Sequence, residues 1–409
     1  MQEFVNLDKD FTLAKTNFNT QPNVLDLLNF CKGIAIVWIV LVHYQPGWFG
    51  WQGVHIFIVL SGFGLTYSCL KKSGVILWKQ WYLRRTEKIL PTYWLMCLSG
   101  FLIMVCVYIF KRHSVATNIL NSAITLILEI LSLKSFSYQL MFSPPPNDPL
   151  WFIPLIIGFY LIFPWLYWLT IKYKTNKVYL IIFLAVAVSE FIYRAISIYW
   201  IDGFPVGFES NLLSVQPLDP LNKLSDTLPF QLQAPFGLFP SRIAEFMLGM
   251  LGASLLVQNT QKFHNIFLNY RIGLVGVLIW LAGCSLIFTG LWGWIFADFL
   301  IALGLIIWIV NLAGIFQQRF SFLFRKISQL GIWSYYIFLS HGAFIYFSDK
   351  VQEKLDVSQS SIISLLICKI SLLGFIAVGT WGTSWLLMKF DNSKFPKLIV
   401  QKTIGRFLQ

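Results

Sequence analysis

The chain is poor in charged residues. Only 12% of its 409 residues are Asp, Glu, Lys or Arg, about half the share in an average soluble domain. Its six cysteines form no C-x-x-C pair, so their spacing predicts neither a zinc site nor a redox disulfide, and we expect no bound metal. It contains no internal repeat, no low-complexity segment, and no stretch between apolar segments long enough for a separate soluble domain. These shortages argue against a soluble enzyme.

Apolar residues are abundant instead. They make up 57% of the chain, and 17% of all residues are aromatic. This excess needs lipid to cover it, and aromatic rings favour the membrane interface. The net charge is +13, but the basic residues cluster in short loops between apolar segments. We therefore interpret the charge as topological and expect no nucleic-acid partner. The mostly polar residues 1–23 do not resemble a cleavable signal peptide.

Ten segments are apolar enough, over roughly 20 residues, to cross a membrane as helices. We predict an all-α integral membrane protein of about ten transmembrane helices. They lie near 24–45, 52–70, 89–110, 150–171, 178–200, 238–257, 272–290, 293–313, 329–347 and 361–388.

An eleventh apolar segment, 117–133, is shorter and contains Asn118, Asn121 and Glu129. With ten spans and a cytoplasmic N-terminus, the inner loops and termini hold 21 Lys and Arg and the outer loops 6. If 117–133 also crossed, the counts would become 12 inside and 15 outside. Because cytoplasmic loops carry the excess of Lys and Arg, segment 117–133 is predicted to re-enter the membrane or lie along its outer face.

This topology predicts three regions and places both termini in the cytoplasm. They are a cytoplasmic segment 1–23, a transmembrane domain 24–390 and a basic cytoplasmic tail 391–409.

Ionisable residues inside a membrane are costly and are functional candidates by default. Lys32 and His43 occupy the first span, eleven positions apart. Eleven residues make about three helical turns, so both side chains lie on one face, roughly 16 Å apart along the axis. Lys32 would hold a phosphate at the cytoplasmic side and His43 would act as a general base further out. The alternative is a snorkelling lysine and an interfacial histidine.

Two pairs of charged residues and a single acid also lie within predicted spans. Glu190 and Arg194 have i, i+4 spacing, and Arg242 and Glu245 have i, i+3 spacing, so each pair is expected to neutralise its own charges. Asp298 has no partner on its own helix and would face a polar cavity or pair with a cation on another span. Alternatively, Glu190, Arg194, Arg242 and Asp298 line the substrate path.

Two further histidines lie in apolar segments. His341 is either a hydrogen-bonded packing residue or part of the substrate path. His55, at the start of the second span, is either a functional candidate or an interfacial residue.

The loop 71–88 contains six cations, including Arg84, Arg85 and Lys88. Arg84 and Lys88 share a helical face. Positive-inside clustering and attraction to anionic membrane lipid explain part of this charge. Six cations in 18 residues exceed what topology needs, so binding of a polyphosphate such as coenzyme A is a second explanation.

Several of these segments, in this order, resemble the acyltransferase-3 family of membrane acyltransferases. The first span has the family's basic residue, ten residues and then His, with Lys32 in place of the commoner Arg. Residues 53–66, GVHIFIVLSGFGLT, resemble the second block, although His55 stands where an acid is common. Arg84-Arg85-x-x-Lys88-Ile-x-Pro is similar to the third block, with Lys88 replacing an Arg. Looser similarities follow at 149–164, 241–253 and 330–345.

The resemblance implies an acyl-coenzyme A donor and an acceptor that is a glycan, a lipid-linked sugar or a related small molecule. It implies His43 as the catalytic residue, either as a general base or through an acyl-histidine. We expect acetyl transfer to a hydroxyl on the outer side of a bacterial inner membrane, with Lys32, Arg84, Arg85 and Lys88 holding the donor's phosphates. The alternative function is a transporter or flippase for a glycolipid or polysaccharide intermediate, although no repeated half with broken helices is visible.

Overall fold

Every regular element in the described part of the chain is a helix. The computed structural model describes residues 24–45, 49–72, 74–112, 115–136, 144–172, 176–200, 235–354 and 362–403. The predicted segment 1–23, most of the outer loop 201–237 and the end of the basic tail lie outside these residues. The α-helices are α3 (Val24–Tyr44), α4 (Gly53–Leu70), α5 (Trp78–Lys111), α6 (Val115–Ile130), α8 (Phe152–Lys172), α9 (Asn176–Tyr199), α11 (Ile243–Gln258), α12 (Thr260–Phe267), α13 (Tyr270–Ile287), α14 (Trp294–Arg319), α15 (Ser321–Gln352), α16 (Ile362–Asp391) and α17 (Phe395–Thr403). Short 3-10 helices are η1 (Phe49–Gln52), η2 (Lys134–Phe136), η3 (Pro145–Trp151), η6 (Pro235–Gly237) and η7 (Phe239–Arg242).

The prediction of an all-α integral membrane protein is confirmed. Within the described residues, nine helices are long and apolar enough to cross a membrane, and each corresponds to a predicted span. The tenth predicted span, 329–347, lies inside α15, a continuous helix of 32 residues. Helix α15 has a lower share of apolar residues than the others because it carries buried polar side chains such as Ser340 and His341.

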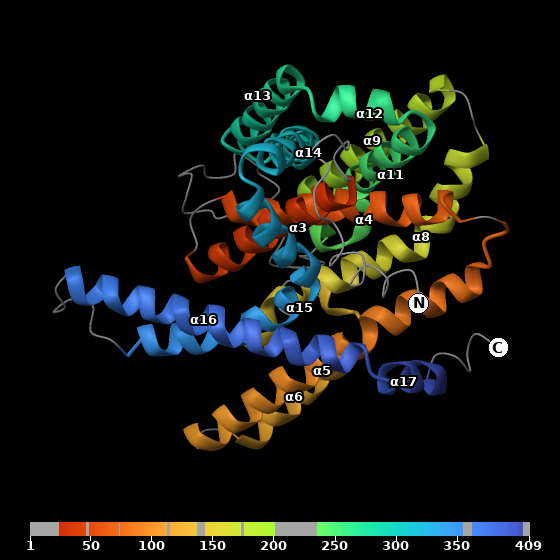
Figure 1. Cartoon of the computed structure of the whole chain (residues 1–409). Helices are drawn as coiled ribbons and strands as arrows, with labels where there is room; N and C mark the ends of the chain where they lie inside the picture. Colours follow the sequence, from red (N-terminus) through yellow and green to blue (C-terminus); the bar gives the residue numbers. More distant parts are fainter. Residues whose placement is uncertain are drawn as a thin grey trace.

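The segment 117–133 forms α6, which runs back along α5 (Figure 1). The Tyr93 hydroxyl donates to the carbonyl of Glu129 at 2.8 Å, and the Trp94 indole N–H donates to the carbonyl of Ile130 at 3.2 Å. Sixteen residues of α-helix span about 24 Å, less than the roughly 30 Å of a bilayer's hydrocarbon core. Helix α6 is thus not among the helices long enough to cross a membrane, and its re-entrant or interfacial position stays a prediction.

Helices α3 and α4 occupy the middle of the molecule (Figure 1). Apolar side chains from α8, α11, α14 and α15 surround them in two adjoining clusters. Helix α3 packs closely against α15, with Gly33 against the Ile327 backbone and Gly331 against Asn29. Small residues at such contacts let two helix backbones approach closely. Because the two helices run in the same direction, their later turns also stay adjacent.

This close packing predicts a large effect of Gly331→Ala. A Cβ at Gly331 would collide with the backbone of Asn29 and Gly33, neither of which can move without shifting the helix. Gly374→Ala, in α16, is the control, because a Cβ there meets nothing within 4 Å and alanine favours a helix by about 1 kcal/mol over glycine. Fluorescence-detected size exclusion is expected to show loss of the folded peak for Gly331→Ala alone. Normal folding of both variants would contradict this packing.

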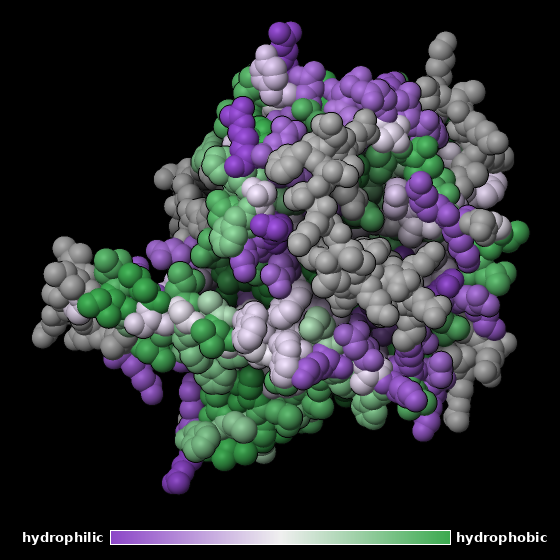
Figure 2. Space-filling view, viewed as in Figure 1, coloured by the Kyte–Doolittle hydropathy of each residue, from purple (hydrophilic) through white to green (hydrophobic). Residues whose placement is uncertain are grey.

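Two helix pairs project from the body and expose apolar side chains. They are α5 with α6 and α15 with α16, and both projections are largely green in Figure 2. Exposed large apolar residues on them include Leu102, Phe110, Ile127, Ile370 and Val378. Such continuous apolar surface is unusual for a soluble monomer and suits contact with lipid.

Candidate functional site

His43 lies in the last turn of α3, with a half-buried side chain. Its Nδ1 is 2.7 Å from the carbonyl oxygen of Ile39, one turn earlier. A carbonyl can only accept a hydrogen bond, so Nδ1 carries the proton in the neutral ring. The Nε2 lone pair of His43 is therefore directed away from this backbone contact, in the tautomer that a general base needs.

His341 on α15 lies beside His43. The two ring centroids are 5.1 Å apart and the rings meet edge to face at 65°. Nδ1 of His341 faces the carbonyls of Ile337 and Phe338, at 3.1 and 2.8 Å, so Nδ1 again carries the proton. The His341 side chain is fully buried, and its Nε2 has no hydrogen-bond partner among the described residues. The structure thus brings together two histidines that lie about 300 positions apart in the sequence.

The helix η3 covers this part of α15. Gly342, next to His341, packs against the backbone of Pro146 and the ring of Pro149. Lys134 in η2 connects α6 with η3: it is fully buried and donates to Glu129 at 2.9 Å and to the carbonyl of Asn147 at 2.6 Å.

The side-chain amide of Asn147 adds two hydrogen bonds to this group of contacts. It donates to the other oxygen of Glu129 at 2.9 Å and to the carbonyl of Cys97 at 3.2 Å. Sequence reasoning missed these contacts and counted Lys134 as an outer-loop cation. An acid in the apolar segment 117–133, followed five residues later by a lysine, was the available signal.

Three of the four predicted donor-binding cations lie near one another, on the Val24 side of His43 along α3 and on α5. Lys32 lies close enough to Lys88 for their charges to repel, and Lys88 interacts in the same way with Arg85. The Arg85 guanidinium lies 5.6 Å from the centre of the Trp81 ring. Arg84, one turn before Lys88 on α5, is exposed. Lys32, Lys88 and Arg85 therefore lie near one another, and Lys32 is about three turns along α3 from His43.

A family model described as an acyltransferase domain, that of the acyltransferase-3 family, matches residues 25–387, most of the chain. The chain belongs to this family. It is a multi-pass membrane acyltransferase. No curated protein and no solved structure matches it.

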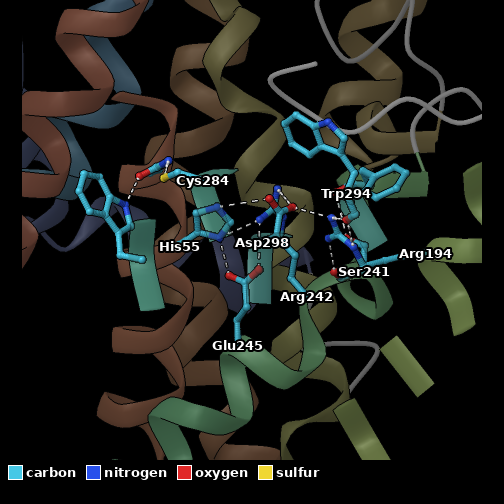
Figure 3. A network of polar contacts seen from close by, with 11 residues as sticks. His55, Arg194, Ser241, Arg242, Glu245, Cys284, Trp294 and Asp298 are labelled. Carbon is cyan, nitrogen blue, oxygen red and sulfur yellow. Dashed lines mark hydrogen bonds and ion pairs between the residues drawn. The ribbon is translucent and has the colours of Figure 1, made fainter. Parts of the chain in front are cut away.

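The acyltransferase also contains a fully buried cluster of six ionisable side chains from four helices and η7. Figure 3 shows its members other than Glu190. Asp298 on α14 lies at its centre, 2.9 Å from an Nη of Arg194 and 3.2 Å from an Nη of Arg242. Arg242 is also 3.2 Å from Glu245. The remaining members are His55 on α4 and Glu190 on α9. Within the described residues, no group of His, Cys, Asp and Glu side chains could hold a metal ion.

Arg194 fixes the cluster to the backbone. Its Nε donates to the carbonyl of Trp294 at 3.0 Å, and its Nη1 donates to that of Ser241, also at 3.0 Å. Glu190 accepts the backbone N–H of Ala244 at 2.7 Å, in the first turn of α11. The cluster therefore ties α9, α11 and α14 together.

Two predictions about this cluster are wrong. Arg194 forms its ion pair with Asp298 rather than with Glu190, because the side chains of α9 and α14 face each other across the helix contact. His55 is not interfacial: it is fully buried, with Nδ1 at 2.8 Å from Glu245. Gly53, the first residue of α4, packs against the middle of α3 at Ala35, so α4 begins inside the protein.

Two other predictions hold. The Arg242–Glu245 pair forms as its spacing predicts, and Asp298 pairs with cations of other elements. A role of Glu190, Arg194, Arg242, Asp298 and His341 in a substrate path stays a prediction. Arg194, Arg242 and Asp298 are paired within the buried cluster, Glu190 accepts a backbone N–H beside it, and His341 lies beside His43.

Proposed function

We propose that this acyltransferase moves an acyl group, with acetyl the expected one, from cytoplasmic acyl-coenzyme A to a hydroxyl of a glycan or lipid-linked sugar on the outer side. The observation that carries the proposal is the layout of α3. One helix holds Lys32 among the cations at one end and His43 beside a second imidazole at the other. The pantetheine arm of coenzyme A, which separates its thioester from its phosphates, suits this separation.

Donor binding uses the cations at the end of α3 near Lys32. Arg85 and Arg84 present planar guanidinium groups that hold phosphate oxygens through two hydrogen bonds, whereas Lys32 and Lys88 act as point charges. The half-buried position of Arg85 against Trp81 limits the conformations of its guanidinium.

His43 Nε2 removes the proton from the acceptor hydroxyl as the hydroxyl oxygen attacks the thioester carbonyl. The new C–O bond forms, the C–S bond breaks, and the leaving thiolate takes the proton back from the imidazolium. Products are one ester and one free thiol. In the acyl-histidine variant, Nε2 attacks the carbonyl first and the hydroxyl then takes the acyl group from the ring.

Release of free thiol tests the proposal directly. The purified protein in detergent is given acetyl-coenzyme A with and without a crude mixture of cell-envelope glycans. Thiol release that requires the glycans supports acyl transfer to a glycan. Absence of both thiol release and acetyl-coenzyme A binding would favour the transporter alternative, because a transporter needs no acyl donor.

One kinetic prediction concerns binding of the acyl donor. Lys88→Gln and Lys32→Gln are each expected to raise the KM for acetyl-coenzyme A roughly tenfold, since a hydrogen bond to a charged group contributes about 1.5–3 kcal/mol. The kcat should change little. Lys79→Gln is the control: Lys79 is exposed in the first turn of α5, and its loss changes the net charge equally. Equal effects of all three substitutions would indicate general attraction of an anion instead of a site.

Another kinetic prediction concerns the role of His341 in turnover. His341→Phe keeps an aromatic ring but removes the Nε2 acceptor, and is expected to lower kcat roughly tenfold, the worth of about one hydrogen bond. His341→Gln places an amide oxygen near the same position and should recover most of the rate. Steady-state kinetics with acetyl-coenzyme A distinguishes the two variants. If Gln and Phe are equally impaired and equally unstable to heat, His341 is only a packing residue.

A further inference from the structure

An acidic side chain lies beside the cations of the proposed donor site. Asp391 is the last residue of α16, and its carboxylate is close enough to Lys88 to attract the ammonium group. Arg85 and Lys32 repel the same ammonium group. A carboxylate at this place opposes the binding of an anion by its own charge. Its contribution to a phosphate site would therefore have to come through the cation that it attracts.

The Asp391 carboxylate is held in place by α15. Tyr336 donates its hydroxyl hydrogen to Asp391 Oδ2 at 2.7 Å, and both side chains are half-buried. A hydrogen bond to a carboxylate is stronger than one between neutral groups. This bond uses one of the two carboxylate oxygens, and the other can still accept from a cation. The carboxylate is thus a fixed point next to the more mobile Lys88.

The tyrosine before Tyr336 holds α15 against α5 next to Lys88. The Tyr335 hydroxyl donates to the carbonyl of Ile89 at 2.7 Å and lies 3.3 Å from Oγ1 of Thr92. Ile89 directly follows Lys88 in the chain. Two consecutive residues of α15 therefore bond to the backbone beside Lys88 and to the acid that attracts it. In Figure 1 the end of α16 and the start of α17 lie beside α5 at this place.

Lys88 is a side chain whose position depends on such neighbours. It is exposed, and two nearby cations repel it. A long lysine side chain loses conformational entropy when a ligand immobilises it. An acid that already restricts the ammonium group lowers this loss. An ammonium group has three donors, so a contact with Asp391 leaves two for a phosphate.

We propose that Asp391 is a positioning residue for the acyl donor: it orients Lys88 toward the donor's phosphates and is itself oriented by Tyr336. This role rests on the proposed function, because Lys88 acts in this way only if coenzyme A binds here. Asp391 acts through Lys88 and not on the donor itself. The rival role is structural, since Asp391 also attracts Lys397 on α17 and would then only connect α16 to α17.

Binding of coenzyme A to the purified full chain in detergent, measured by calorimetry, tests the proposal. Asp391→Asn is expected to raise the Kd roughly threefold, the effect typical of a partly exposed ion pair, and to leave kcat at saturating acetyl-coenzyme A unchanged. Tyr336→Phe should raise the Kd by less. Glu87→Gln is the control, because it removes an acid about 100° around α5 from Lys88, and it should not raise the Kd. A lower Kd for Asp391→Asn would make the carboxylate a competitor of the phosphates and overturn the proposal.

The same substitution in Lys88→Gln separates positioning from a structural role. If Asp391 acts through Lys88, adding Asp391→Asn to Lys88→Gln should leave the Kd of the single variant unchanged. An equal rise in both backgrounds, or no change in either with a lower thermal stability, would mean that Asp391 only connects helices. Absence of coenzyme A binding by the unmodified protein is a distinct result, which refutes the donor site of the proposed function and this role with it.

Discussion

His43→Ala is expected to abolish acyl transfer, with a loss of at least about 100-fold in kcat. A positioned general base contributes about 10²–10⁴-fold, and loss of an acyl-histidine intermediate would remove the reaction route entirely. The measurement is free-thiol release from acetyl-coenzyme A in the presence of the glycan mixture. Because the cations at the other end of α3 are unchanged, binding of acetyl-coenzyme A should stay within a few-fold of the original.

The fold of this variant should be intact. The His43 ring is half-buried, and its hydrogen bond is to the carbonyl of Ile39 on its own helix, so its removal leaves no charge without a partner. His264→Ala, on the surface helix α12, is the matched control and should keep full activity. Normal thiol release by His43→Ala would rule out His43 as base and as nucleophile.

The spans could be predicted because each is an apolar run bounded by charge. The count of Lys and Arg also separated segment 117–133 from the predicted spans, since this count uses the loops and not the contacts between helices. The sequence did not predict the ends of α15. The helix has 32 residues and extends beyond the predicted 329–347 at both ends. Polar residues that face the protein interior interrupt the hydropathy signal without interrupting the helix.

Residue spacing alone predicted the site only where its residues share one helix. Lys32 and His43 fall on one face of α3 by their spacing alone. The contact of His43 with His341 depends on α3 and α15 running side by side, which depends in turn on the close packing at Gly33 and Gly331. Spacing cannot reveal such a contact. For the same reason, the partner of Arg194 was misassigned to its own helix.

The second large effect is expected at the Arg194–Asp298 pair. Arg194→Met leaves Asp298 with Arg242 as its remaining guanidinium partner and leaves the carbonyls of Trp294 and Ser241 without this donor. Removing one partner of a buried ion pair costs about 3–5 kcal/mol of folding free energy. Asp298→Leu should cost a similar amount, because it leaves two buried guanidinium groups with fewer carboxylates. Both variants should show a large fall in thermal stability in detergent.

The double variant distinguishes charge pairing from simple packing. If the ion pair is what each substitution disrupts, Arg194→Met combined with Asp298→Leu should cost less than the sum of the single effects, by roughly 0.5–3 kcal/mol. The exposed pair Lys350–Glu353, at 2.5 Å with side chains 42% and 60% exposed, is the matched control. Alanine at either of those positions should cost less than about 1 kcal/mol. Additive losses at Arg194 and Asp298 would mean that each residue stabilises the protein through other contacts, and that the buried cluster does not act as one unit.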